Sequence, residues 1–337
     1  MNVQPLWLRQ LRQSISPSVL ALMYHRVAEV DFDPWDLCIS PAHFEKQLQW
    51  LKKTNRVISV NQLVDQLQTG KLTHRGLVLT FDDGYTDNFT VAKPLLEKYE
   101  LPATFFLTTD SIFNRQPFWW DELQFLIFDT HLLPQTLSIQ IADENFLFDL
   151  DDESELTQRL MQLQKSWKAS SPPPSKRCSL YLSIWKKMRP LLHNDQQKIL
   201  AYLRNWASSD VQIRPEDSAI SLAQLTELID HPLIDIGAHS LSHPALSDHK
   251  EATQRHEIAT SKNILEKISH RSITSFAYPY GDYDSRTQKI VREEGFSIAF
   301  TTNAVQTRGR SNQYQIGRFP VPNCTGEQLQ KQLDQIL

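Results

Sequence analysis

The chain has 337 residues, of which 40% are hydrophobic and 22% charged, and this composition excludes a disordered or fibrous protein. Its formal net charge is −4, from 35 basic and 39 acidic residues, which is too small a field to recruit nucleic acid or an anionic membrane. The three cysteines lie far apart in the sequence and are odd in number. They predict buried thiols of a reducing compartment and no disulfide framework.

Strand and helix patterns alternate in the first third of the chain. Short apolar runs predict buried strands, at 18–24, 77–81 and 103–108. Apolar residues at helical spacing predict helices between these strands, at 44–51, 63–67 and 89–99. Strands that alternate with helices predict a parallel sheet with helical crossovers.

The first apolar run also has to be weighed as part of a signal peptide, because Arg9 and Arg12 precede it. The run from Val19 to Tyr24 is short for a signal sequence, and no small-residue cleavage site follows it. No segment reaches the roughly 18 apolar residues that span a bilayer. We therefore interpret the run as a buried strand and expect a cytoplasmic protein.

The pattern changes between residues 113 and 220, where the chain is aromatic, free of glycine and mostly helical in period. This segment includes Phe118-Trp119-Trp120-Asp121 and an alternating stretch at 137–148. We interpret it as an insertion of roughly 100 residues into one strand-to-helix connection. The expected division of the chain is a first barrel part, the insertion and a second barrel part, at 1–112, 113–220 and 221–337.

Strand and helix patterns resume at Ser221, where Ser221-Leu222-Ala223-Gln224 predicts a capping box. Further strands are predicted at 233–237, 272–277, 296–300 and 318–321. Further helices are predicted at 251–269 and 327–337, and another between them ends at residue 294.

Polar residues closely follow four of these predicted strands: His25, Asp82-Asp83, His239 and Tyr280. In parallel α/β folds and barrels, the carboxyl ends of the strands form the face that binds ligands. Separate strands therefore bring polar side chains to one rim. Each residue also has a plain structural alternative, since a histidine after an apolar strand is more often a hydrogen-bonded core residue than a catalyst.

Adjacent carboxylates at Asp82-Asp83 repel each other when buried, and a metal bound to one would leave the other free to act as a general base. The alternative is a solvated Asp-Asp-Gly turn.

His239 and His243, four residues apart, can chelate one cation, although two unrelated surface histidines are the commoner case. Pro244 disfavours helical geometry at His243, so the pair is expected on a loop.

At this point the residues resemble a known family, the polysaccharide deacetylases of carbohydrate esterase family 4. The segments Thr80-Phe81-Asp82-Asp83-Gly84 and His239-Ser240-Leu241-Ser242-His243-Pro244 resemble its first two signature motifs, and the turn from Ala277 to Gly281 resembles the third. The resemblance implies a distorted (β/α)7-type barrel and one divalent metal ion, usually zinc. It also implies a carbohydrate substrate, from which an N-acetyl group or, less often, an O-acetyl ester is hydrolysed.

The resemblance also implies roles for individual residues. Asp83, His239 and His243 would hold the metal, and Asp82 would be the general base that takes a proton from the attacking water. The backbone N–H of Tyr280 would stabilise the tetrahedral oxyanion.

Three features depart from the family pattern. Ala277 stands where the third motif usually carries an arginine that orients the catalytic aspartate; Arg318 or Arg26 would replace it, and we favour Arg318. The tryptophan of the fourth motif has no counterpart after Gly295-Phe296. No histidine follows His270, so the usual C-terminal histidine is absent.

The segment Met23-Tyr24-His25-Arg26 resembles the N-terminal element of a subgroup with rearranged motifs and a long helical insertion. That subgroup includes deacetylases of poly-N-acetylglucosamine. The resemblance then implies that His25 is the general acid that protonates the leaving amine.

Within the insertion, Trp119, Trp120 and Asp121 are candidates to line a sugar subsite, and the alternative is that the aromatics form the insertion's own core. Pro279 of the third motif is also assigned to substrate binding. We predict a metal-dependent hydrolase that removes N-acetyl groups from an amino-sugar glycan or glycan precursor. The alternatives are a deformylase or amidohydrolase that acts on a nucleotide- or lipid-linked amino sugar, and a non-catalytic glycan-binding protein on the same scaffold.

Overall fold

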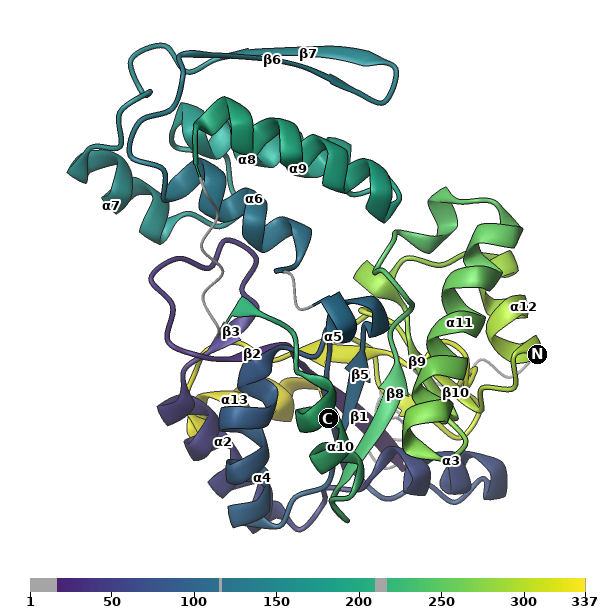
Figure 1. Ribbon diagram of the computed structural model, residues 1–337. Helices are drawn as coiled ribbons and strands as arrows, with labels where there is room; N and C mark the ends of the chain where they lie inside the picture. Colours follow the sequence, from purple (N-terminus) through teal and green to yellow (C-terminus); the bar gives the residue numbers. More distant parts are fainter. Residues whose placement is uncertain (1–16, 115–116, 210–216, 337) are drawn as a thin grey trace, which may run out of the picture.

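A curled sheet of seven parallel strands forms the centre of the molecule (Figure 1), a computed structural model that describes residues 17–114, 117–209 and 217–336. The strand order is β10-β9-β8-β5-β4-β1-β12. These strands are β1 (Ser18–Tyr24), β4 (Gly76–Phe81), β5 (Ala103–Leu107), β8 (Ile234–Ala238), β9 (Ser275–Ala277), β10 (Ile298–Phe300) and β12 (Arg318–Pro320). A short β11 (Thr307–Arg308) pairs antiparallel with the start of β1.

The segment that leads into β12 joins the two edges of the sheet. Ile316 bridges to Phe300 of β10, and its backbone N–H donates to Ala299 O at 2.9 Å. β12 then pairs with Ala21–Met23 of β1. This connection curls the sheet into a distorted (β/α)7-type barrel, and the expected fold class is confirmed.

Helices cover the outside of this sheet (Figure 1). They are α2 (Pro41–Thr54), α3 (Val60–Thr69), α4 (Lys93–Tyr99), α5 (Thr109–Asn114), α10 (Leu222–Ile229), α11 (Glu251–Ser269), α12 (Ser285–Glu293) and α13 (Gly326–Ile336). The predicted capping box at Ser221 is present, with Gln224 as its partner. The helix expected over 89–99 begins with a π-helical turn at Asn88–Ala92. Several short elements escaped prediction, among them β2 (Arg26–Val27), β3 (Cys38–Ile39), β11 and α5.

The segment after α5 forms a separate layer that stands beyond the end of β5 (Figure 1). Its described residues form four helices and one hairpin: α6 (Trp119–Phe128), α7 (Gln158–Ser166), α8 (Lys176–Met188), α9 (His193–Ala207), β6 (Thr136–Ile141) and β7 (Glu144–Asp149). The hairpin occupies the stretch whose sequence alternates. The insertion is therefore largely helical, as expected.

A hydrophobic core separate from that of the barrel fills this insertion, and it includes Trp119 and Trp120. The buried guanidinium of Arg177 joins three of its segments by donating to the carbonyls of Ile127, Thr130, His131, Glu153 and Ser154. Pro117 bridges to Ser218, so the two ends of the insertion lie side by side. The division at 113 and 220 remains our proposal.

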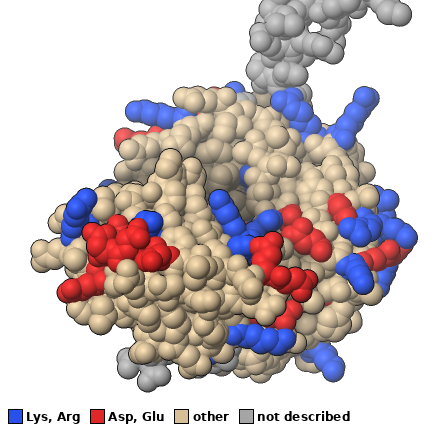
Figure 2. Space-filling view, turned by 90° about the horizontal axis from the view of Figure 1, so that it is seen from above, with Lys and Arg blue, Asp and Glu red and all other residues tan. Residues whose placement is uncertain are grey.

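The surface seen from above carries acidic and basic side chains interspersed among neutral residues (Figure 2). In the described ranges, no helix is both long enough and apolar enough to cross a membrane. Residues Arg9 and Arg12, on which the question of a signal peptide depended, lie outside the described residues.

Candidate active site

Asp82 and Asp83 follow β4 directly, and both are buried, with 2% and 4% of their surface exposed. Asp83 has a φ of 70° and the next residue, Gly84, a φ of 84°. A Cβ at Gly84 would lie 2.8 Å from Leu107 Cδ2, so glycine is required for both its conformation and its space. This tight turn allows the two neighbouring carboxylates to meet different partners.

Asp82 forms a bidentate ion pair with Arg318, the first residue of β12. Arg318 Nη1 donates to Oδ1 at 2.6 Å and Nη2 donates to Oδ2 at 2.7 Å. Arg318 is fully buried and its Nε donates to Thr301 O. Burial alone would raise the pKa of Asp82, but the Arg318 guanidinium, with His239, outweighs burial and holds that pKa well below its ordinary value.

Arg26, the other arginine considered for this position, lies elsewhere. Its Nε donates to Asp87 Oδ2 and its Nη1 to Asp217 Oδ1, both at 2.9 Å. Arg318 is thus the arginine that contacts Asp82 in the absence of an arginine at Ala277.

His239 follows β8 and is almost fully buried. Its Nδ1 donates to the carbonyl of Ala277 at 2.8 Å, which fixes the tautomer and leaves the Nε2 lone pair for the site. Nε2 lies 3.5 Å from Asp83 Oδ1 and 4.0 Å from Asp82 Oδ2. Burial opposes a charge on this ring, but the two carboxylates outweigh burial and raise the pKa of His239.

His243 lies on a loop, as expected from Pro244, and its Nε2 is 3.4 Å from Asp83 Oδ1. Ser240 and His243 both adopt left-handed conformations, with φ of 65° and 62°. Glu257 of α11 holds this loop by accepting from Leu241 N, Ser242 N and Ser242 Oγ at 2.8–3.1 Å. Burial lowers the pKa of His243 to about 3, so the ring is in the neutral form that ligates metals.

These three residues fit a divalent metal. One ligand atom from each of Asp83, His239 and His243 lies within 4.8 Å of the others, and all three residues are buried. Two imidazole nitrogens and a carboxylate oxygen are ligands that zinc accepts, and a three-ligand set leaves a position open for water or substrate. Within the described residues, the ion-pair partners of the buried Asp83 carboxylate are the imidazoles of His239 and His243, which suits a site for a cation.

His25 lies beside Asp82, with its Nε2 3.9 Å from Asp82 Oδ2. About 19% of its side chain is exposed, so the ring is accessible to solvent. Its backbone carbonyl accepts from Asn88 Nδ2 at 2.7 Å, which anchors the residue after β1. The first strand therefore brings His25 to the same rim as the two aspartates.

Pro279 and Tyr280 belong to a tight turn after β9, in which Tyr280 has a φ of 57°. The Tyr280 ring packs against the His243 ring, with centroids 4.5 Å apart. Gly281 is required here, because a Cβ would lie 2.1 Å from Thr302 Oγ1. The turn thus places the backbone of Tyr280 next to a candidate metal ligand.

Trp120, from the insertion, also reaches this site. Its ring centroid is 4.8 Å from that of His243, and its Nε1 donates to Tyr85 Oη at 2.8 Å. Tyr85 in turn donates to Asp121 Oδ2 at 2.7 Å. Burial, which outweighs the nearby Arg26, raises the pKa of Asp121 to about 7. Trp120 is therefore both part of the insertion's core and a neighbour of the candidate metal site.

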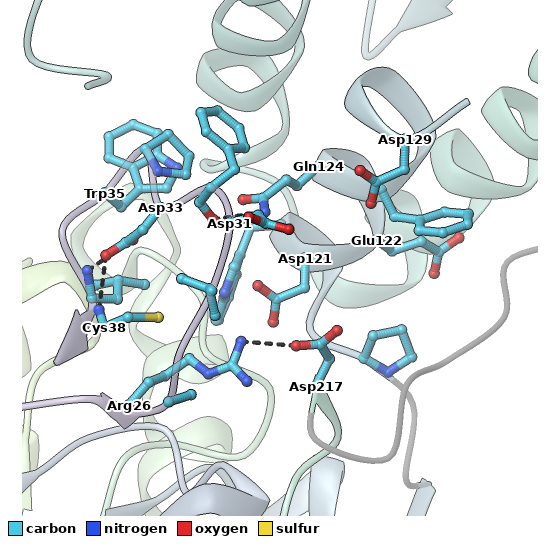
Figure 3. A pocket seen from close by; sticks show the side chains of 18 of the residues that line it. Arg26, Asp31, Asp33, Trp35, Cys38, Asp121, Glu122, Gln124, Asp129 and Asp217 are labelled. Atoms are coloured by element: carbon cyan, nitrogen blue, oxygen red, sulfur yellow. Dashed lines mark hydrogen bonds and ion pairs between the residues drawn. The ribbon is translucent and has the colours of Figure 1, made fainter. Parts of the chain in front are cut away.

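A cavity of about 580 Å³ adjoins this region, between the 28–37 loop and helix α6 (Figure 3). Trp120, Asp121 and Arg26 line it, and Arg26 and Asp217 face each other across one end (Figure 3). None of Asp83, His239 and His243 is among its lining residues. The cavity is thus a neighbour of the candidate metal site and not the site itself.

Two residues of this arrangement were missed by sequence reasoning. Tyr85 follows the first motif and Glu257 lies within a long polar helix, so neither has a local pattern that distinguishes it. Their partners are 35 and 15 or 16 residues away in the sequence. Only the folded structure brings these partners together.

Residues 69–130 and 183–299, just over half of the chain, match the sequence model of the polysaccharide deacetylase family. The protein therefore belongs to the polysaccharide deacetylase family. The expectation of an enzyme that hydrolyses carbon–nitrogen bonds other than peptide bonds agrees with this family membership.

Among curated proteins, the poly-beta-1,6-N-acetyl-D-glucosamine N-deacetylase of Staphylococcus aureus strain MSSA476 is 30% identical over 108 residues. The match covers 28% of this chain and 37% of that protein, so the chain spans little more than a third of this relative.

Solved structures share the fold. The Streptococcus pyogenes deacetylase PplD aligns with a TM-score of 0.55 at 17% identity, over 94% of this chain and 98% of its own. IcaB from Ammonifex degensii aligns with a TM-score of 0.56 at 18% identity, over 95% of this chain and 97% of its own. At these identities the likeness establishes the barrel fold alone.

Proposed function

We propose that the protein removes N-acetyl groups from an amino-sugar glycan or glycan precursor, with one divalent metal ion, zinc being the usual metal for such ligands. The observation that carries this proposal is the pairing of a three-ligand set with a separate, ionised carboxylate. Asp83 faces His239 and His243, whereas Asp82 is held by Arg318 with Oδ2 4.0 Å from His239 Nε2. A pure binding protein has no use for the second carboxylate.

The chemistry that a divalent ion supplies at such a site is polarisation of the acetyl carbonyl and a lower pKa of water. Asp82 takes the proton of the attacking water at Oδ2, the oxygen nearer to His25 and His239. Arg318 keeps Asp82 ionised and oriented, and it also makes the Asp82 carboxylate less basic. A carboxylate with a lowered pKa is a weak base, so proton transfer to it depends on an acidified water.

His25 is assigned the second proton transfer, to the nitrogen of the leaving amine. Its Nε2 is 3.9 Å from Asp82 Oδ2, so both groups can reach the same tetrahedral centre. The backbone N–H of Tyr280 is assigned to the oxyanion. Its left-handed turn next to His243 supports this role, because preorganised N–H donors stabilise charge that develops in the transition state.

Substrate binding is assigned to Trp120, Asp121 and Pro279. Trp120 and Asp121 line the 580 Å³ cavity beside the metal site. Its lining combines aromatic rings with many acidic side chains, which can accept hydrogen bonds from the hydroxyl groups of a carbohydrate. Pro279 lies in the turn that carries Tyr280. The similarity to a protein named for poly-beta-1,6-N-acetyl-D-glucosamine supports an N-acetylated β-linked glucosamine chain as the first substrate to test.

The test is a substrate panel with the zinc-loaded protein, in which released acetate and formate are both measured. Acetate from N-acetylated oligosaccharides supports the proposal. Formate from N-formyl sugars alone would instead identify a deformylase, and glycan binding without either product would identify a binding protein. Asp82→Asn is the matched control, because it keeps the size of the side chain and removes the base; turnover is expected to fall by roughly 10²–10⁴-fold.

A further inference from the structure

The two candidate histidine ligands are held in different ways. His239 has a hydrogen bond from Nδ1 to Ala277 O, the usual means by which a protein orients a metal-binding imidazole. His243 Nδ1 is buried, and no group in the described part of the chain forms a hydrogen bond with it. Something other than a hydrogen bond must therefore set the rotation of the His243 ring.

Ring packing supplies that constraint. Trp120 and Tyr280 both contact the His243 ring, with centroid distances of 4.8 and 4.5 Å and interplanar angles of 57° and 74°. Tilted and edge-on arrangements at such distances are favourable for aromatic pairs. The backbone of His243 is fixed separately, because its N–H donates to Ser240 Oγ at 3.0 Å.

Trp120 is itself fixed in three ways. Phe118 stacks on it at 4.8 Å with an interplanar angle of 7°. Its indole N–H donates to Tyr85, and Tyr85 donates to Asp121, the residue that follows Trp120 in α6. Tyr85 lies just after the Asp82-Asp83 turn, so this chain of hydrogen bonds ties the insertion to the barrel two residues from a candidate ligand.

We infer that Trp120 is a positioning residue for the metal site: the insertion orients His243 through contact with the Trp120 ring, and the metal affinity of the barrel depends on this contact. The inference rests on the proposed function only in taking Asp83, His239 and His243 as the metal ligands. It gives the insertion a part in building the catalytic centre, beyond contact with the carbohydrate.

The experiment measures zinc affinity by competition with a chromophoric chelator, and the absorption spectrum of the cobalt-substituted protein reports the ligand geometry. Trp120→Ala is expected to weaken zinc binding by roughly 10-fold or more, the size of effect that residues supporting a metal ligand commonly have. Its cobalt spectrum is expected to differ from that of the wild type. Trp120→Phe keeps a ring against His243 and is expected to restore most of the affinity.

The matched control is Trp167→Ala. Trp167 is equally buried in the insertion's core, at 4% exposure against 6% for Trp120, but it packs on Phe32, Phe128 and Tyr181. Trp167→Ala is expected to keep wild-type zinc affinity. Wild-type affinity and spectrum in Trp120→Ala, or an equal loss in Trp167→Ala, would overturn the inference.

If Trp120→Ala fails to fold, Trp120→Leu, which retains apolar volume without a ring face, decides the question in the same way. Metal affinity is measured without any sugar, so the result is separate from the proposed deacetylation. If the wild type releases no acetate but Trp120→Ala binds zinc more weakly, the proposed reaction is refuted and the inference is supported. If the wild type releases acetate but Trp120→Ala keeps its zinc affinity, the proposed reaction is supported and the inference is refuted.

Discussion

Replacement of Arg318 by methionine tests the assignment of Asp82 most directly. Arg318 is fully buried, and both of its terminal nitrogens donate to Asp82 at 2.6 and 2.7 Å. Methionine keeps most of the apolar stem and removes the charge. The variant therefore leaves a buried carboxylate without its cation.

The size of the effect follows from the two lost contacts. Hydrogen bonds to charged groups contribute about 1.5–3 kcal/mol each, and breaking a buried ion pair from one side costs about 3–5 kcal/mol. Protonation of Asp82 limits the loss, because burial raises the pKa of this carboxyl once the guanidinium is gone. We expect Arg318→Met to lower the free energy of unfolding by about 3 kcal/mol at neutral pH.

The assay is urea unfolding of the metal-free protein, so that metal binding does not add to the measured stability. Asp82→Asn, which leaves Arg318 without its anion, is measured in parallel with the double variant. Removal of both charges is expected to recover at least half of the loss seen in Arg318→Met, because no buried charge is then left unpaired. A loss below about 1 kcal/mol, or a double variant no more stable than Arg318→Met, would refute the reasoning.

Four further variants test other parts of the site. His239→Ala is expected to remove most metal binding, measured by metal content after gel filtration; stoichiometric metal in this variant would contradict the ligand assignment. His25→Ala is expected to slow amide hydrolysis by roughly 10²-fold while sparing activated aryl acetates, whose leaving group needs no proton, and equal loss on both substrates would point to a structural role. Glu257→Gln is expected to destabilise the 240–243 loop by about 1–3 kcal/mol, seen as faster amide hydrogen exchange at Leu241 and Ser242, and unchanged exchange would count against it. Burial raises the folded-state pKa of Asp121 to about 7, above the unfolded value of about 3.9, so the contribution of Asp121 to stability is expected to fall as pH rises from 4 to 7. The unfolding free energy of the wild type relative to Asp121→Asn should therefore fall across this range, and parallel curves would contradict the raised pKa.

Much of the barrel was predictable because its strands are buried on both faces. β1, β4 and β5 are buried at every residue, and such strands are visible in a sequence as uninterrupted apolar runs. The carboxyl ends of parallel strands share one edge of the sheet. Residues directly after the runs, such as Asp82 and His239, could therefore be expected to lie together.

Contacts between distant segments were not predictable to the same degree. The sequence offered two candidates for the arginine that pairs with Asp82. Both are buried in ion pairs: Arg318 with Asp82, and Arg26 with Asp87 and Asp217. Local pattern cannot distinguish them, because the choice depends on the register of β12 against β1. The contact of Trp120 with His243 likewise depends on how the insertion docks.

The two adjacent carboxylates explain how this rim can combine metal binding with acid–base chemistry. Left alone, two buried aspartates side by side would share a proton, and neither would be reliably ionised. Here the left-handed turn at Asp83 separates their surroundings: Asp82 meets a fixed cation, Arg318, whereas Asp83 lies beside the Nε2 atoms of two imidazoles. The charge of Asp82 is balanced by Arg318, and Asp83 is left to a different role. Under the proposed assignment, one dipeptide would provide both an ionised base and a buried metal ligand.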